Sequence, residues 1–388
     1  MKIVWKNLDE IQPGAICGDD IFDPNSFVLL AHKSSVLDSK TLDFLKNHDV
    51  TWIPIQVKTE TAGDKELAGK NIALDIEDKY AEESKPLAPN LPLILSDEKY
   101  HETISRFNTL AQDFIKNKKL KKDELMNLSN EMVNEVLKTK NSVFNFMTDV
   151  APGFIIKHGI NTAIIASMLG KSLKQSRHLL VKITKVAMLH DLGLIYAKKE
   201  STLDFVEDIV DQYRKKDIDR IKIHPILSIK IINKVSPGFL DKEEENAILE
   251  HHERYDGKGF PMGAKGKKIN YISRILSIAD AYDTLMSTRE GKSGMNPYNA
   301  LKWIVSNTRK IFDPDIVNVF VKLVGLYPTG TKIRLSNGKE ALVISKGEKS
   351  IGRPIVLLDD EELNLEDYPE LFVSEVLDID KVETDQRT

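Results

Sequence analysis

The feature that most constrains the fold is the spacing of apolar residues between positions 97 and 326. Over this span they recur at intervals of three and four residues, as in Ile104, Phe107, Leu110 and Phe114, and strand-like alternation is scarce. Such intervals place side chains on one face of a helix. A span of about 230 residues is also long enough to bury a substantial core. The pattern therefore predicts a mainly α protein built on an all-helical domain.

A small mixed α/β module is predicted before this domain, over residues 1–58. Its one helix could be capped by Ser39, with Leu42, Phe44 and Leu45 facing inward. Residues 59–96 are polar and then rich in proline, which is typical of a linker. Ser96 is suited to cap the helix that follows.

After residue 326 the apolar pattern changes to period two, which predicts a small β appendage over residues 327–380 and a polar tail over 381–388. A hairpin is expected at Asn337 and Gly338, with positive φ at both residues. The charged segment 198–223 interrupts the helical pattern and is expected to be a flap or a short surface helix.

Charge and cysteine content narrow the classes of function. The 388 residues include 55 basic and 59 acidic side chains, which argues against binding to long nucleic acid. Cys17 is the only cysteine, so neither a disulfide framework nor a cysteine metal site is expected. No run approaches the roughly 18 apolar residues of a membrane span, and no signal peptide is apparent. These features predict a cytoplasmic protein that does not bind membranes.

Seven histidine and aspartate residues stand at the ends of apolar runs in the helical domain. They are His158, His190, Asp191, His224, His251, His252 and Asp280. Imidazole with a minority of carboxylates suits iron, manganese, zinc or nickel, and is unsuited to calcium or magnesium. Each histidine alone could be a hydrogen-bonded core residue. The HD pair, the HH pair and the terminal aspartate together favour a metal centre.

The number of these side chains predicts two divalent ions. Seven ligands exceed what one site with an open position can use, and a carboxylate such as Asp191 can bridge ions about 3.5 to 4 Å apart. Water between two such ions ionises near neutral pH and becomes a nucleophile. The expected target is a phosphoryl centre.

The motifs HDLG, HHERYDGKGFP and ISRILSIADAYDTLMSTR resemble the HD-GYP family, a branch of the HD-domain metal-dependent phosphohydrolases. The resemblance is strong over residues 150–326. It implies an HD-type helical bundle with two iron or manganese ions. It also implies hydrolysis of cyclic di-GMP, or of a related cyclic dinucleotide, to linear dinucleotide or GMP in bacterial signalling.

The same resemblance implies a role for each of the seven residues. His158, His190 and Asp280 would bind one ion, His224, His251 and His252 the other, and Asp191 would bridge them. His190 and Asp191 form the catalytic HD pair. Phe154 stands where members with three ions have a glutamate, so two ions are expected.

The substrate contacts that the resemblance implies are less complete. Arg289 and Lys292 match basic positions that hold ligand phosphates, which an arginine fork and a lysine charge can do; the alternative is a solvated turn. Phe260 replaces the tyrosine of the GYP signature and keeps a ring for stacking. Lys258 could add charge to the loop or be a solvated loop residue.

Two departures from the family pattern leave other functions open. Leu194 stands where the family has a lysine thought to approach the scissile phosphate or protonate the leaving oxygen, and Phe260 lacks the tyrosine hydroxyl. A catalytically weak or inactive module that binds a cyclic nucleotide, or a partner such as a diguanylate cyclase, is therefore the second hypothesis. A phosphohydrolase of mononucleotides is the third. The intact ligands favour the enzyme.

A homodimer paired through residues 97–118 is an alternative to internal packing of that helix.

Overall fold

The computed structural model forms two compact units, residues 1–87 and 88–388, which are described separately. The described residues are 2–8, 11–17, 21–22, 29–31, 35–47, 52–57, 94–139, 154–194, 220–287 and 294–377. The predicted linker up to residue 93, the segment 198–219 and the tail 381–388 lie outside them. No helix of the described part is long and apolar enough to cross a membrane.

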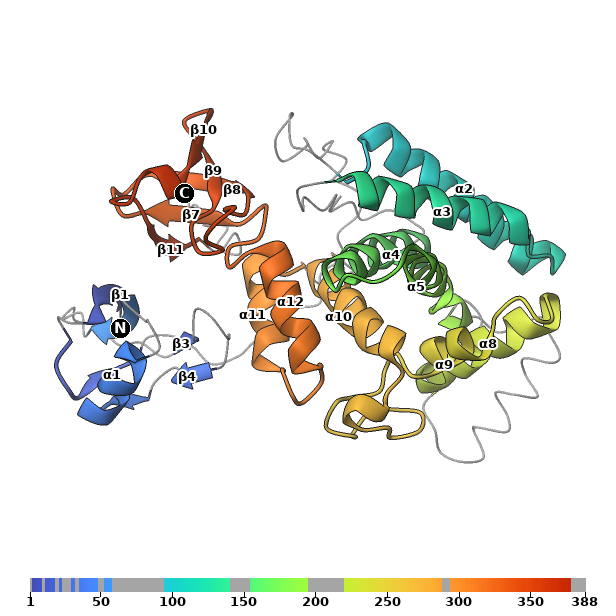
Figure 1. Ribbon diagram of the computed structural model, residues 1–388, viewed down its shortest axis with the longest axis horizontal. Coiled ribbons are helices and arrows are strands. Elements are labelled where there is room, and N and C mark those ends of the chain that lie inside the picture. Colours follow the sequence, from blue (N-terminus) through green and yellow to red (C-terminus); the bar gives the residue numbers. More distant parts are fainter. Residues whose placement is uncertain are drawn as a thin grey trace, which may run out of the picture. The chain divides into compact units, whose positions relative to one another are not determined.

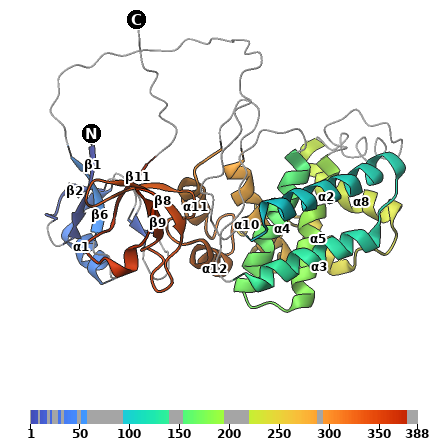
Figure 2. The ribbon, with the colours of Figure 1, turned by 90° about the horizontal axis from the view of Figure 1, so that it is seen from above.

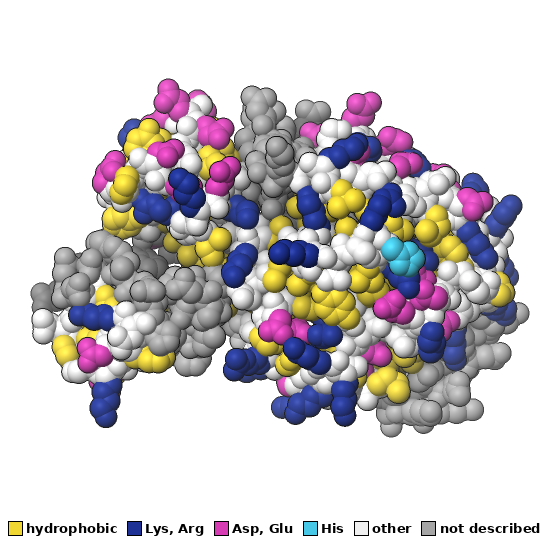
Figure 3. Space-filling view, in the orientation of Figure 1, with side chains coloured by type: hydrophobic (Ala, Val, Ile, Leu, Met, Phe, Trp, Pro, Cys, Tyr) yellow, Lys and Arg dark blue, Asp and Glu magenta, His cyan; other side chains and the backbone are white. Residues whose placement is uncertain are grey.

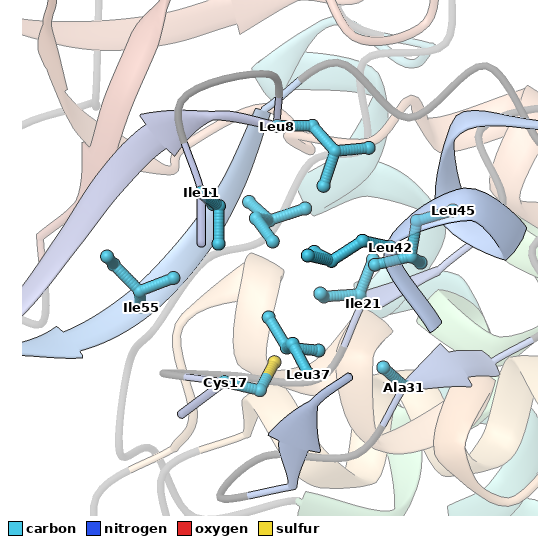
Figure 4. Close-up of a cluster of buried hydrophobic side chains, with 10 residues drawn as sticks. Leu8, Ile11, Cys17, Ile21, Ala31, Leu37, Leu42, Leu45 and Ile55 are labelled. Atoms are coloured by element: carbon cyan, nitrogen blue, oxygen red, sulfur yellow. The ribbon is translucent and has the colours of Figure 1, made fainter. Parts of the chain in front are cut away.

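The first unit is a small α/β module whose described strands form antiparallel pairs around one helix, α1 (Ser39–Lys46). The pairs are β1 (Lys2–Asn7) with β6 (Trp52–Val57), β2 (Ala15–Ile16) with β5 (Val36–Leu37), and β3 (Ile21–Phe22) with β4 (Leu29–Ala31). Leu8, Ile11, Cys17, Leu37 and Leu45 meet in its core (Figure 4).

Two details of α1 differ from the sequence-based expectation. The N-cap is Asp38, whose carboxylate accepts a hydrogen bond from the Thr41 backbone N–H at 2.7 Å, and Ser39 is the first helical residue. Asp38 is the better cap because its charge also opposes the helix dipole. Leu42 and Leu45 are buried as predicted, but Phe44 is 44% exposed. Phe44 lies one residue before Leu45, about 100° around the helix.

The second unit is mainly helical. Its described helices are α2 (Asp97–Asn117), α3 (Lys122–Lys138), α4 (Phe154–Ser172), α5 (Arg177–Leu189), α8 (His224–Val235), α9 (Lys242–Leu249), α10 (Tyr271–Met286), α11 (Pro297–Ser306) and α12 (Pro314–Val324), with short 3-10 turns at Arg220–Ile223 and Gly266–Lys268. The mainly α class predicted from the apolar spacing is confirmed.

Helix α4 lies at the centre of this bundle and packs against α2, α3, α5, α10 and α12 (Figures 1 and 2). Its residues 158–170 are all buried, which is typical of a helix surrounded by others. Ser96 caps α2 as predicted, since its hydroxyl accepts a hydrogen bond from the Lys99 N–H at 3.3 Å. On the face that Figure 3 shows, basic and acidic side chains of the described residues are interspersed.

The β appendage is a five-stranded antiparallel sheet in the order β10-β9-β8-β7-β11. Its strands are β7 (Lys332–Leu335), β8 (Glu340–Ser345), β9 (Ile355–Leu358), β10 (Glu361–Asn364) and β11 (Val373–Val376), with a 3-10 turn at Leu365–Asp367. The predicted hairpin joins β7 to β8, but only Gly338 has positive φ, at 84°. The Gly338 N–H bonds the Leu335 carbonyl, so a type I turn precedes one left-handed glycine.

A buried ion pair joins α10 to α12. Asp313, 1% exposed, caps α12 by accepting from the Asp315 N–H and also pairs with the Arg274 guanidinium. Asp313→Ala is expected to lower the free energy of unfolding by about 3 kcal/mol, because it removes the N-cap of α12 and takes the carboxylate from the largely buried Arg274 guanidinium. Denaturant titration would measure this. Lys267→Ala, which breaks an exposed ion pair with Asp315, is the control and should cause no measurable change. Equal effects of the two variants would contradict the assignment.

Candidate metal centre

The structure brings all seven predicted residues together from five helices and the turns that end two of them. His158 lies on α4, His224 begins α8 and Asp280 lies on α10; His190 and Asp191 end α5, and His251 and His252 follow α9. They form two groups that could each hold an ion, His158, His190 and Asp280 in one and Asp191, His224, His251 and His252 in the other. The donor atoms within each group lie within 4.8 Å of one another.

Asp191 faces both groups. Its Oδ1 lies 3.1 Å from His224 Nε2, 3.5 Å from His190 Nε2 and 3.7 Å from His251 Nε2. Its Oδ2 lies 3.6 Å from the Nε2 of His158. A single carboxylate therefore offers one oxygen near the donors of each group, which is the geometry that a bridging ligand requires.

The turn that carries His190 and Asp191 is fixed to the start of α8. The Ser228 hydroxyl donates to the His190 carbonyl and accepts from the Gly193 N–H, both at 2.8 Å. A Cβ atom at Gly193 would lie 2.2 Å from the carbonyl oxygen of His224. The glycine of the HDLG motif is thus required for the close approach that places Asp191 beside His224.

Hydrogen bonds to the backbone orient two of the imidazoles. His190 Nδ1 lies 2.6 Å from the Ala187 carbonyl oxygen, and His251 Nδ1 lies 2.6 Å from that of Ile248. A carbonyl only accepts, so each Nδ1 carries the hydrogen. In the neutral ring the lone pair is then on Nε2, directed at the centre.

The ionisation states of three of the donors also suit a cation. Burial lowers the pKa of His190 to about 4, and burial together with His251 holds the pKa of His252 well below its usual range. Burial alone would raise the pKa of Asp191, but the surrounding histidines, led by His190, lower it well below its usual range. The aspartate is thus ionised, and His190 and His252 are neutral.

Two donor atoms at the centre have no hydrogen-bond partner. These are Nε2 of His190, a residue with no exposed surface, and Oδ1 of Asp191. Buried polar atoms that lack a partner are costly. A divalent transition-metal ion would satisfy both atoms, and imidazole with carboxylate is its preferred donor set. The residues therefore fit such an ion.

Asp283 is a functional residue that the sequence analysis missed. Its Oδ2 lies 2.7 Å from His158 Nδ1, and its Oδ1 accepts from the Asn161 amide at 2.8 Å. Burial lowers the pKa of His158, but bonds to Asp280 and Asp283 outweigh burial and raise it well above the usual value. The signal was present in the sequence. Asp283 follows Asp280 by three residues, which places both on one helix face.

The loop after the HH pair is held by a second missed residue, Glu253. Its Oε1 accepts from the N–H groups of Met262 and Gly263, at 2.6 and 2.9 Å, so the loop folds back on the histidine pair. Phe260 lies in this loop with its ring centroid 4.8 Å from that of His252, and the two rings are tilted by 32°. A Cβ atom at Gly259 would lie 2.3 Å from the Arg254 backbone nitrogen, so this position also requires glycine.

The other predicted substrate residues are less constrained. Lys258 is exposed, and its backbone N–H donates to Asp256. Leu194 is half-buried, one turn after Asp191, and its N–H donates to the Asp191 carbonyl at 2.9 Å. Arg289 and Lys292 lie outside the described residues, so their predicted phosphate contacts stay predictions.

The helical unit thus gathers five histidines and two aspartates into two adjoining groups, each of which could hold a metal ion. The chain belongs to the HD domain family, whose model matches residues 131–338. The family recognition made from the motifs is confirmed.

Three relatives illustrate the family. The chain is 25% identical over 235 residues to a cyclic di-GMP phosphodiesterase of Pseudomonas aeruginosa, covering 59% of this chain and 54% of the relative. It is 22% identical over 207 residues to the cyclic di-GMP phosphodiesterase PdeB of Borreliella burgdorferi, covering 53% and 52%. It is 24% identical over 187 residues to the 3′3′-cGAMP-specific phosphodiesterase 3 of Vibrio cholerae, covering 48% and 39%. The match thus spans about half the length of the first two relatives and less of the third.

Proposed function

We propose that the chain is a two-metal phosphodiesterase that hydrolyses cyclic di-GMP to linear dinucleotide, GMP or both. The observation that carries the proposal is the Asp191 carboxylate, which faces two separate groups of histidine and aspartate donors. The names of the relatives supply the substrate class, since two of the three are cyclic di-GMP phosphodiesterases. The binding-module alternative is less favoured because all seven ligands are intact and the matched relatives carry names of enzymes.

The metal groups follow from the two clusters. We infer that His158, His190 and Asp280 hold one ion, that His224, His251 and His252 hold the other, and that Asp191 is shared. Iron and manganese are the proposed metals. When bound, two such ions would polarise the phosphodiester and would lower the pKa of a bound water to near neutral pH. The protein contributes a fixed array of ligands, because Ser228 and the backbone carbonyls of Ala187 and Ile248 hold the donors in place.

The substrate side of the site is built by the loop that Glu253 folds back. Phe260 lies against His252 and offers an aromatic face at the edge of the centre, which suits stacking with a nucleobase. Arg289 and Lys292 are the proposed phosphate clamp. Lys258 is exposed on the same loop and could add positive charge.

A comparison of substrates tests the proposed specificity. Manganese- or iron-loaded protein would be incubated with cyclic di-GMP, with 3′3′-cGAMP and with a mononucleotide, and initial rates would be measured by chromatography. We expect the highest kcat/KM with cyclic di-GMP. A preference for 3′3′-cGAMP would indicate that the substrate is the one named for the Vibrio cholerae relative and not cyclic di-GMP. Turnover of the mononucleotide alone would contradict a cyclic-dinucleotide phosphodiesterase.

Leu194 provides a test of the missing proton donor. Leu194→Lys is expected to raise kcat about tenfold or more, because a positioned general acid typically contributes a hundredfold to ten-thousandfold. Steady-state kinetics on cyclic di-GMP would measure the change. Leu194→Met, which keeps the length of the side chain without a charge, is the matched control and should leave kcat near the wild-type value. An unchanged kcat in the lysine variant, at full metal content, would show that this position does not limit turnover.

Three further parts of the functional hypothesis remain proposals. A cytoplasmic location fits the predicted messenger substrate. A signalling partner such as a diguanylate cyclase and a homodimer were predicted from the sequence alone. Size-exclusion chromatography with light scattering would test the dimer directly.

A further inference from the structure

Helix α2 precedes residues 131–338, which match the HD family, yet one of its side chains is linked to the metal centre. The Tyr100 hydroxyl donates to Asn161 Oδ1 at 2.6 Å, and Asn161 Nδ2 donates to Asp283 Oδ1 at 2.8 Å. Asp283 Oδ2 in turn lies 2.7 Å from His158 Nδ1. A continuous path of side-chain hydrogen bonds therefore runs from α2 through α4 and α10 to His158.

Every member of this path is buried. Tyr100 and Asp283 are 1% exposed, His158 is 2% exposed and Asn161 is 8% exposed. Water is therefore poorly placed to replace a lost partner, and a group that loses its hydrogen bond pays the full cost of desolvation. Removing the Tyr100 hydroxyl at the far end of the path should therefore weaken the hydrogen bonds that follow it, as far as His158.

Each hydrogen bond has one possible direction, so each member fixes the next. The carboxylate of Asp283 can only accept, which requires the NH₂ group of Asn161 on its side and the amide oxygen on the other. The Tyr100 hydroxyl donates to that oxygen and holds the amide in this orientation. A flipped amide would place an oxygen against the carboxylate. With Asp283 Oδ1 satisfied, Oδ2 accepts from the Nδ1–H of His158 and directs Nε2 toward the centre.

We propose that Tyr100, Asn161 and Asp283 are positioning residues that hold the His158 ring with Nε2 directed at Asp191 and Asp280. They thereby raise the affinity for the ion that His158, His190 and Asp280 bind. Helix α2 thereby contributes to orienting a ligand of the metal centre. The inference rests on the proposed function in one respect, namely that the two groups of donors bind ions.

The geometry makes the expected effect selective for one ion. The ring of His251, in the other group, is oriented by a backbone carbonyl, that of Ile248, and not by this path. Loss of the Tyr100 hydroxyl should therefore weaken the ion at His158 and leave the ion at His224, His251 and His252 unchanged. A role of Tyr100 limited to packing would not distinguish between the two ions.

Cobalt binding to the full chain tests the proposal. Co²⁺ would be titrated into metal-free protein in competition with a chelator, and its visible absorption would report each bound ion. We expect two ions in the wild type. In Tyr100→Phe the affinity for one ion should fall several-fold, up to about tenfold, while the other is unchanged. Thr103→Val is the matched control, since it removes another buried hydroxyl of α2, one that bonds only the Lys99 carbonyl. Both of its ions should bind as in the wild type.

Asp283→Asn gives a second measurement on an isosteric variant. A carboxamide would present its NH₂ group to either Asn161 or His158. Facing His158, it would force the imidazole hydrogen onto Nε2, where an ion must bind. We expect the affinity for the same single ion to fall about 10- to 100-fold.

The outcomes separate the inference from the function on which it rests. Two wild-type ions with both affinities unchanged in Tyr100→Phe and Asp283→Asn would overturn the positioning role and leave the proposed function intact. Equal weakening of both ions in these variants would also overturn it, in favour of a packing role. A wild-type protein that binds no Co²⁺ would overturn the metal centre itself, and the inference with it.

Discussion

Asp191→Asn is expected to reduce hydrolysis of cyclic di-GMP at least about a thousandfold. The carboxylate faces both sets of donors, with Oδ1 3.1 Å from His224 Nε2 and Oδ2 3.6 Å from His158 Nε2. An amide of the same shape has one neutral oxygen, and its NH₂ group would either donate to a histidine lone pair that an ion needs or lie against the ion itself. Initial rates on metal-loaded protein would measure the loss.

The control for this variant is Asp123→Asn, which removes an exposed carboxylate in the first turn of α3. It should hydrolyse cyclic di-GMP at the wild-type rate. Circular dichroism would establish that both variants are folded. Retention of more than a tenth of wild-type activity in Asp191→Asn would contradict the role of Asp191 as the shared ligand.

Gly193→Ala is expected to have the largest effect on stability. The added Cβ atom would lie 2.2 Å from the His224 carbonyl oxygen and 2.8 Å from the Ser228 backbone nitrogen. Backbone atoms, unlike side chains, cannot relieve such a clash by changing rotamer. The start of α8 would have to move, and His224 would move with it. We expect a fall of about 3 kcal/mol or more in the free energy of unfolding, together with loss of at least one bound ion.

Denaturant titration and metal analysis would measure these two effects. Gly352→Ala is the matched control, because a Cβ atom there would meet nothing closer than a Leu326 methyl carbon at 3.8 Å. Its stability and metal content should equal those of the wild type. A Gly193→Ala protein with wild-type stability and two bound ions would contradict the close approach of the HD turn to α8.

The sequence predicted the helical class and the seven central residues because both depend on local patterns. Helical spacing is read over a few turns, and the HD and HH pairs end apolar runs. The partners that orient these residues were not predicted. Asp283 meets His158 across 125 residues of sequence, and Ser228 meets His190 across 38. Such contacts depend on how helices pack. For Asp283 the sequence carried only a local hint, its spacing of three residues from Asp280.

The smaller corrections have local causes. Asp38 caps α1 in place of Ser39 because a charged oxygen one residue earlier accepts the same kind of hydrogen bond. At the β7–β8 hairpin only Gly338 has positive φ, since a type I turn with one left-handed glycine avoids placing Asn337 in that region. Neither correction changes the candidate site.

Turnover of cyclic di-GMP by the metal-loaded protein is the most direct test of the proposed phosphodiesterase. Iron- or manganese-loaded chain would be incubated anaerobically with the dinucleotide, and the products would be separated by chromatography beside Asp191→Asn. We expect linear dinucleotide or GMP from the wild type and none from the variant. Unchanged cyclic di-GMP, with two ions confirmed in the wild-type protein, would contradict the proposed phosphodiesterase.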